Sequence, residues 1–170
     1  MIAEIRQDME INVLIDEGFE QHLDIDWLRS IVEQVLLAEN TGSNVEAGLV
    51  ITSQEKVHQL NRYYLGEDEP TDVLSFSARE EISADTTPFI TPPDGMIHLG
   101  EVLISYPQAV IQAKEHHHST QKEVAILIIH GIFHLLGYEH DTPELQHIMS
   151  IRECEILCLI EESRCLYPNG

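Results

Sequence analysis

The order of hydrophobic and polar positions along the chain predicts four short strands. Residues 10–16 (EINVLID) alternate between apolar and polar side chains, which is typical of a half-buried strand. Apolar segments at 45–52, 72–77 and 98–105 predict the other three. Between 79 and 97 the sequence is acidic and contains three prolines, so it predicts a long loop.

Helical periodicity lies between these strands. Apolar residues recur at helical spacing from Asp24, a plausible N-cap, to Asn40. Further helices are predicted at 53–64, at 107–115, from Ser119 or Thr120 to Gly137, and from Pro143 to about residue 164. The helix ending at Gly137 is apolar almost all round, which predicts burial. Thr120 and Glu123 have the spacing of a capping box at its start.

Strands interspersed with helices predict an α/β fold, with α+β as the open alternative. We expect one domain over residues 1–170, with a mixed sheet of about four strands, a buried central helix and flanking helices. The length of 170 residues suits a single domain with a proper core. No apolar run approaches the roughly 20 residues that span a bilayer, and the N-terminus has no signal-peptide pattern. A cytoplasmic protein with no membrane partner is therefore expected.

Charge and cysteine usage refine this view. The formal net charge of −21 disfavours non-specific binding to nucleic acid or membranes, so an anionic substrate would need a local basic patch or a metal. Three cysteines, at 154, 158 and 165, lie in the last helical stretch. An odd, clustered set is not a disulfide framework, and we expect these thiols to be buried in the core.

The chemically most informative segment is HGIFHLLGYEH, which contains His130, His134 and His140. The first two lie four residues apart, so a helix places their rings on one face. Gly137 then lets the chain reverse and return His140 to the same point. Three imidazole ligands leave a tetrahedral metal one open position, as in catalytic sites. Zinc is the first choice of metal, and another divalent transition metal is the alternative.

The general base of such a site is not evident. Zinc proteases with this histidine spacing have a glutamate directly after the first histidine, where this chain has Gly131. Glu101, Glu139 and Asp141 are candidates for base or for orienting a ligand. The run His116–His118 precedes the next predicted helix, and we interpret it as a solvated turn.

These segments resemble the signatures of the YbeY family of ribosomal RNA maturation factors, described as zinc-dependent endoribonucleases. HGIFHLLGYEH is similar to the family's histidine motif, with Phe133 and Glu139 as mild departures. LNRYYLGEDEPTDVLSF at 60–76 resembles a second signature, and LGEVLIS at 99–105 a third. The resemblance implies metal ligands at His130, His134 and His140, in a cleft lined by the TDVLSF strand.

The resemblance also implies a function: cleavage of single-stranded RNA in 3′-end maturation of small-subunit ribosomal RNA, and ribosome quality control. Ribosomal RNA and the small ribosomal subunit are the implied partners, and DNA is not expected. Family members usually have an arginine directly before the glycine that is Gly66 here, whereas this chain has Leu65. Arg62, one helical turn earlier, is the nearest basic residue. It is a weak catalytic candidate, together with Glu101.

Two other functions stay open from the sequence. A different metallohydrolase, most simply a peptidase, would share the histidine spacing, but Gly131 removes its proton-shuttling glutamate. A non-catalytic ribosome-assembly factor with a structural metal would explain Leu65.

Overall fold

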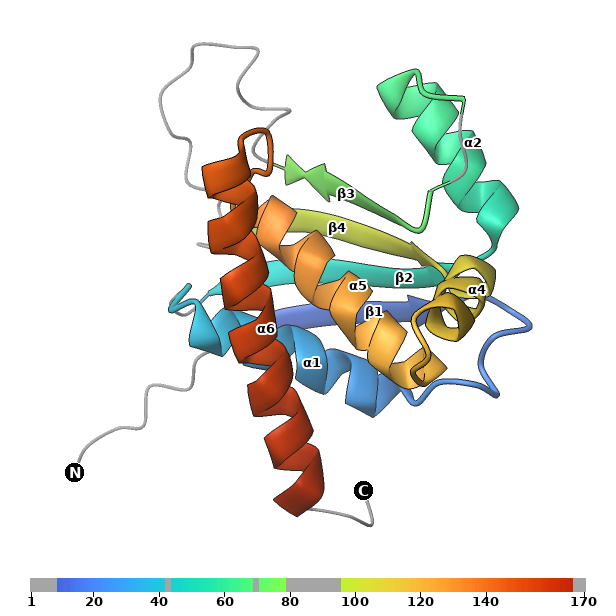
Figure 1. The fold of residues 1–170 in the computed structure, drawn as a ribbon. Helices are drawn as coiled ribbons and strands as arrows, with labels where there is room; N and C mark the ends of the chain where they lie inside the picture. The colour runs from blue at the N-terminus through green and yellow to red at the C-terminus, as the bar shows by residue number, and fades with distance from the viewer. Residues whose placement is uncertain (1–8, 42–43, 69–70, 79–95, 167–170) are drawn as a thin grey trace, which may run out of the picture.

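A computed structural model describes residues 9–41, 44–68, 71–78 and 96–166 of the chain. The loop predicted at 79–97 lies outside these residues except for its last two positions, of which Ile97 begins a strand. The described part of the chain forms one mixed sheet with helices on both faces (Figure 1). The α/β expectation is confirmed.

The four predicted strands are all present, each within one residue of its predicted bounds. They are β1 (Glu10–Ile15), β2 (Val45–Thr52), β3 (Val73–Ser77) and β4 (Ile97–Ser105). Their order is β1-β2-β4-β3, with β1, β2 and β4 parallel and β3 antiparallel to β4. Strand β2 is almost entirely buried because it lies between two parallel neighbours.

The predicted helices are also present. They are α1 (Ile25–Ala38), α2 (Gln54–Leu65), α4 (Tyr106–Glu115), α5 (Thr120–Leu135) and α6 (Pro143–Leu166). Asp24, Ser53, Ser105 and Ser119 cap the first four, each accepting a hydrogen bond from a backbone N–H in the first turn. Helices α1 and α5 cover one face of the sheet, and α6 crosses over both (Figure 1).

The second face is only partly covered. Helix α2 packs there through Val57 and Leu60 against Leu74, Phe76 and their neighbours. Beyond α2, a hollow of about 570 Å³ lies over the exposed part of the sheet, lined by Asn12, Glu46, Gly48, His98 and Glu101 among others. The main core therefore lies between the sheet and the pair α1 and α5.

Helix α5 is the central helix of that core, as its apolar sequence predicts. Ten of its residues are buried, including Gly131. A Cβ atom added at Gly131 would lie 2.5 Å from Cγ1 of Val102 on β4 and 3.3 Å from Oγ of Ser75 on β3. The hydroxyl of Ser75 donates a hydrogen bond of 3.0 Å to the carbonyl oxygen of Gly131. The absence of a side chain here lets α5 lie directly against β3 and β4.

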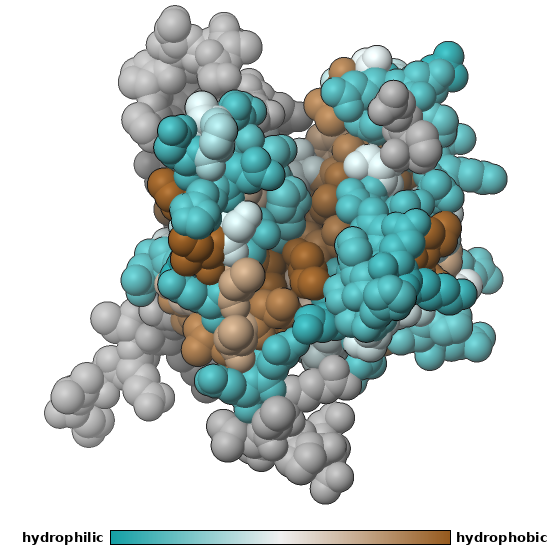
Figure 2. All heavy atoms as spheres, viewed as in Figure 1, coloured by the Kyte–Doolittle hydropathy of each residue, from teal (hydrophilic) through white to brown (hydrophobic). Residues whose placement is uncertain are grey.

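Two sequence interpretations are wrong. Ser119, not Thr120, is the N-cap of α5, and the carboxylate of Glu123 contacts histidines instead of closing a capping box. Cys154 and Cys158 are free and exposed because α6 turns that face away from the core. Exposed Ile148 and Ile151 also interrupt the polar surface of α6 (Figure 2). Within the described residues, no helix is both long and apolar enough to span a membrane.

The contact at Gly131 gives a stability prediction. Gly131→Ala should lower the free energy of unfolding by about 0–2 kcal/mol, because overpacking costs about 1–3 kcal/mol and the higher helix propensity of alanine returns about 1 kcal/mol. Urea unfolding of the single variant, of Val102→Ala and of the double variant measures the coupling. In the Val102→Ala background the alanine at 131 should cost less. An equal cost in both backgrounds would show that the two positions do not clash.

Candidate metal centre at the end of α5

The C-terminus of α5 ends in a Schellman motif that sets the direction of the following loop. Gly137, in the left-handed region with φ of 97°, donates its N–H to the carbonyl of His134, and the N–H of Tyr138 bonds the carbonyl of Phe133. The rings of Phe133 and Tyr138 stack with centroids 4.5 Å apart. This apolar contact fixes the reversal, so the residues after Gly137 return toward the helix.

The reversal brings the three predicted histidine rings together. The ring centroids of His130 and His134 are 4.6 Å apart, those of His134 and His140 4.9 Å, and those of His130 and His140 5.9 Å. His130 and His134 are partly buried on α5, whereas His140 lies on the exposed loop. Their role as metal ligands stays a prediction.

Hydrogen bonds orient the two helical histidines. Nδ1 of His134 is 3.2 Å from the carbonyl oxygen of Tyr138, which can only accept, so this nitrogen has the hydrogen. Nδ1 of His130 is 2.9 Å from Oε1 of Glu153 and likewise donates to it. In the neutral rings both Nε2 atoms then have free lone pairs, and these two atoms are 3.0 Å apart. Two opposed lone pairs at this distance repel unless a proton on one nitrogen or a metal ion beside both compensates them.

This arrangement is what a metal ion requires. Ligating histidines usually donate their second nitrogen to a carboxylate or a carbonyl, which fixes the tautomer and the ring orientation. Burial lowers the pKa of His134, and the neighbouring His130 and His140 lower it further. Protonation is thus disfavoured at His134, and the ring stays in the neutral form that binds metals.

A second chain of contacts supports the loop from behind. The hydroxyl of Tyr138 donates a 2.6 Å hydrogen bond to Glu39, the C-cap residue of α1. Arg152 on α6 donates to Glu39 through Nε and to the carbonyl of Ala38 through Nη2. Burial and the bond to Glu39 raise the pKa of Tyr138, so the phenol stays protonated as a donor.

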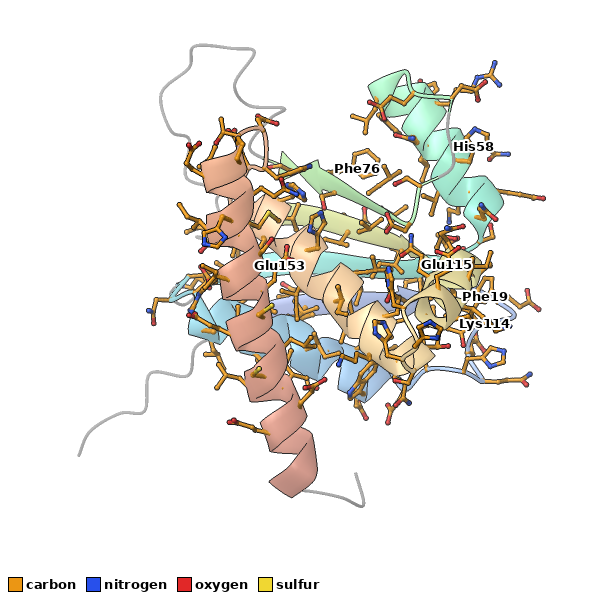
Figure 3. The ribbon with its side chains drawn as sticks, in the orientation of Figure 1. Phe19, His58, Phe76, Lys114, Glu115 and Glu153 are labelled. Atoms are coloured by element: carbon orange, nitrogen blue, oxygen red, sulfur yellow. The ribbon has the colours of Figure 1, made fainter. Side chains whose placement is uncertain are left out.

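The neighbours Arg152 and Glu153 therefore hold two sides of the histidine cluster. Arg152 acts on His134 through Glu39 and Tyr138, and Glu153 contacts His130 directly from α6 (Figure 3). The sequence predicted the loop after Gly137 but none of the side chains that support it. For Arg152 and Glu153 the only signal in the sequence is that they are charged residues of a long helix, and such residues usually face solvent.

The rings border a cleft of about 470 Å³ between α5 and the segment from α2 to β3. Val73, Ser75 and Ser77, on the α5 side of β3, line it, as the resemblance implied for this strand. The cleft also contains Leu65, whose side chain is 55% exposed. The residue at the position of the expected arginine thus lines the same cleft as the histidines.

The catalytic candidates lie in different places. Glu139 lines the cleft, whereas Arg62, on the exposed surface of α2, and Asp141 are not among its lining residues. Glu101 is on the opposite face of the sheet, where it lies over Gly48, because its neighbour Val102 points toward α5. The structure therefore does not bring Glu101 to the histidines.

The cleft is acidic. Glu67, Asp72 and Glu139 line it, and none of its described lining residues is lysine or arginine. Among the described lining residues, the histidines are therefore the groups through which positive charge, as a proton or a bound cation, can meet a phosphate.

The run His116–His118 forms the predicted turn, with His116 and His117 exposed, but two of its rings are not simply solvated. Nδ1 of His116 and Nε2 of His118 both contact Oε2 of Glu123, at 3.1 and 2.5 Å. The side chain of His118 is only 19% exposed. Glu123, seven residues after His116 and five after His118, was the signal in the sequence. We had interpreted its carboxylate as part of a capping box instead.

Comparisons with known proteins agree on one family. The family profile described as "Endoribonuclease YbeY" matches residues 11–161. A protein named Endoribonuclease YbeY from Dehalococcoides mccartyi is 47% identical over 144 residues, covering 83% of this chain and 84% of its own length. One of the same name from a Roseiflexus species is 37% identical over 155 residues, covering 91% of this chain and 94% of its own.

A solved structure is similar in fold. The solution structure of a Thermotoga maritima protein covers 94% of this chain and 95% of its own, with a TM-score of 0.58 and 23% identity. At this identity the likeness concerns the fold alone.

The contact between Glu153 and His130 gives a prediction about metal affinity. Glu153→Gln should weaken zinc binding about 10- to 100-fold, because such outer partners orient the ligating ring and raise its basicity. Competition with a chromophoric chelator measures the affinity. Glu162→Gln is the matched control, since it makes the same charge change on an exposed position of α6. Equal affinities in the two variants would mean that Glu153 does not position His130.

Proposed function

The chain belongs to the YbeY family of endoribonucleases, and from this premise we propose that it is a metal-dependent endoribonuclease specific for single-stranded RNA. The supporting observation is the opposition of the Nε2 atoms of His130 and His134, 3.0 Å apart at the edge of the cleft. With Nδ1 of both rings donating, the two Nε2 atoms point their lone pairs to one place, where a metal ion can bind both. His140, whose ring is within 5.9 Å of both others, is the proposed third ligand.

We propose zinc as the metal held by these residues, with another divalent transition metal as the alternative. Zinc in such a site supplies a water of lowered pKa and polarises a phosphoryl oxygen. Glu139 is the base candidate that lies in the cleft, where its exposed carboxylate can accept a proton. The hydroxyl of Ser75 donates its proton to the carbonyl of Gly131, and its oxygen can still accept a hydrogen bond from a ribose hydroxyl along the β3 wall.

The proposed substrate is ribosomal RNA, and the proposed reaction is maturation of the 3′ end of small-subunit ribosomal RNA, with a part in ribosome quality control. The small ribosomal subunit is the proposed partner, and the cytoplasm, where ribosomes are assembled, is the proposed location. The open cleft supports a single strand as substrate, because unstacked nucleotides can enter a depression that a duplex would bridge.

A peptidase is less well supported. Gly131 replaces the glutamate that zinc peptidases require, and its position faces Val102 and Ser75 with no room for a side chain. The base cannot be restored at this position within the observed packing.

Loss of the first histidine should remove both metal and activity. His130→Ala should bind no zinc at this site and should cleave a structured RNA with single-stranded loops at least about 100-fold more slowly, as for loss of a major catalytic group. Metal content and gel-resolved cleavage are the measurements. His147→Ala, an exposed histidine on α6, is the control. Cleavage that persists after the metal is lost would contradict the mechanism.

A non-catalytic role in ribosome assembly is the second candidate, and the acidic cleft with Leu65 favours it. Leu65→Arg should raise the affinity for RNA about 10-fold, because it adds a positive charge to the cleft. A 10-fold change in affinity equals about 1.4 kcal/mol of binding free energy. If the protein cuts RNA, cleavage should rise with affinity. Leu65→Gln is the uncharged control. Tighter RNA binding without any cleavage in the zinc-loaded variant would favour the assembly role over the nuclease.

A further inference from the structure

A second cluster of metal-ligating side chains lies at the corner between α4 and α5. His116 is the C-cap residue of α4, His118 lies in the turn, and Glu123 is in the first turn of α5. One ligand atom from each of the three lies within 4.8 Å of the other two. His117 between them is in the left-handed region with φ of 57°, so the two flanking rings can turn to the same side.

The distances at this corner are close to those of a coordination shell. Oε2 of Glu123 is 3.1 Å from Nδ1 of His116 and 2.5 Å from Nε2 of His118. In a tetrahedral zinc site with bonds of about 2.0–2.2 Å, neighbouring ligand atoms lie roughly 3.4 Å apart. To hold an ion, Nε2 of His118 must move away from Oε2 of Glu123 by roughly 1 Å, whereas the half-exposed His116 ring needs a smaller shift.

The charge of the cluster also calls for a cation. The side chain of Glu123 is 3% exposed, and a buried carboxylate is costly unless a positive charge compensates it. The ion-pair partners of Glu123 recorded among the described residues are His116 and His118, which are uncharged in their neutral forms. A divalent ion at this point would compensate the carboxylate and use both nitrogens as ligands, in place of the hydrogen bonds that they make to Oε2 of Glu123.

The surroundings leave access for the ion. A hollow of about 320 Å³ adjoins the cluster, and Asp72 and Glu115 add carboxylates to its wall. Glu115 ends α4 beside the corner (Figure 3). Two imidazoles and one carboxylate are a donor set for zinc or a similar divalent transition metal, with the fourth position open to water.

This cluster is separate from the centre at the end of α5, although His130 borders the same hollow. Glu123 and His130 are seven residues apart on one helix, which corresponds to about 10 Å along the axis. Two-metal catalysis requires ions about 3.5–4 Å apart. An ion at the corner therefore acts on structure, by joining the end of α4 to the start of α5.

We propose that His116, His118 and Glu123 form a second metal site, which binds zinc or a similar divalent transition metal and fixes the turn between α4 and α5. The site stands independently of the proposed nuclease centre, because it shares no ligand with it. A zinc ion there binds the folded state and stabilises it by mass action.

Zinc titration of the full-length protein tests this site, with a chromophoric chelator as competitor and native mass spectrometry for stoichiometry. Two zinc ions should bind the unsubstituted chain. His116→Gln should weaken the binding of one of these two ions at least 10-fold. It should also reduce the zinc-dependent rise in Tm by the part that the corner site contributes. His117→Asn is the matched control, because asparagine tolerates the left-handed backbone and retains both ligands.

The two sites are distinguished by which substitution removes which ion. His130→Ala should leave one zinc, and adding His116→Gln should remove it. If the unsubstituted chain binds a single zinc that only His116→Gln removes, the corner site stands and the proposed nuclease centre fails. If His116→Gln binds zinc as tightly and in the same number as His117→Asn, the corner site is wrong. His116 is half exposed, so this variant should fold, which circular dichroism verifies.

Discussion

The close approach of α5 to β3 and β4 at Gly131 is the constraint on which the rest of the structure depends. Without a side chain there, the helix lies on Val102 and Ser75 and becomes the centre of the core. That position fixes the rotation of the helix, and the rotation places His130 and His134 at the rim, facing the cleft along β3. The residue that makes the helix pack closely is thus also the one that excludes a peptidase base.

The two histidine clusters lie near opposite ends of this one helix and are built in different ways. At the C-terminus the Schellman motif returns the chain, and the orienting partners Glu153 and Tyr138 come from α6 and the loop. At the N-terminus the ligands come from the preceding turn and meet a buried carboxylate of α5 itself. The first arrangement leaves ligand lone pairs facing each other, and the second leaves a carboxylate in need of a counter-charge. In the proposals above, a cation stabilises both.

The sequence predicted those features that depend on local periodicity and spacing. Apolar patterns located each described strand within one residue, because burial dictates the apolar positions of a strand. The spacing of His130, His134, Gly137 and His140 predicted that the three histidine rings converge. The strand order and the route of α6 depend on packing between distant segments and could not be read in this way. Glu153 and His130 are 23 residues apart, and Arg152 and Glu39 are 113 apart, so only the crossing of α6 over α1 and α5 joins them. Cys154 and Cys158 were misplaced for the same reason, since the outward face of α6 is set by that crossing, whereas the side chain of Cys165 lies outside the described part of the chain.

The acidic lining of the cleft has a consequence for how an RNA strand would respond to ionic strength. Proteins that bind nucleic acid through lysine and arginine displace condensed counterions, so their affinity falls steeply as salt rises. The described lining of this cleft has acidic residues instead of lysine and arginine: Glu67, Asp72 and Glu139. A strand whose contacts were confined to these described residues and a metal ion would displace few counterions from lysine or arginine contacts, so its affinity would change less with salt than that of such proteins.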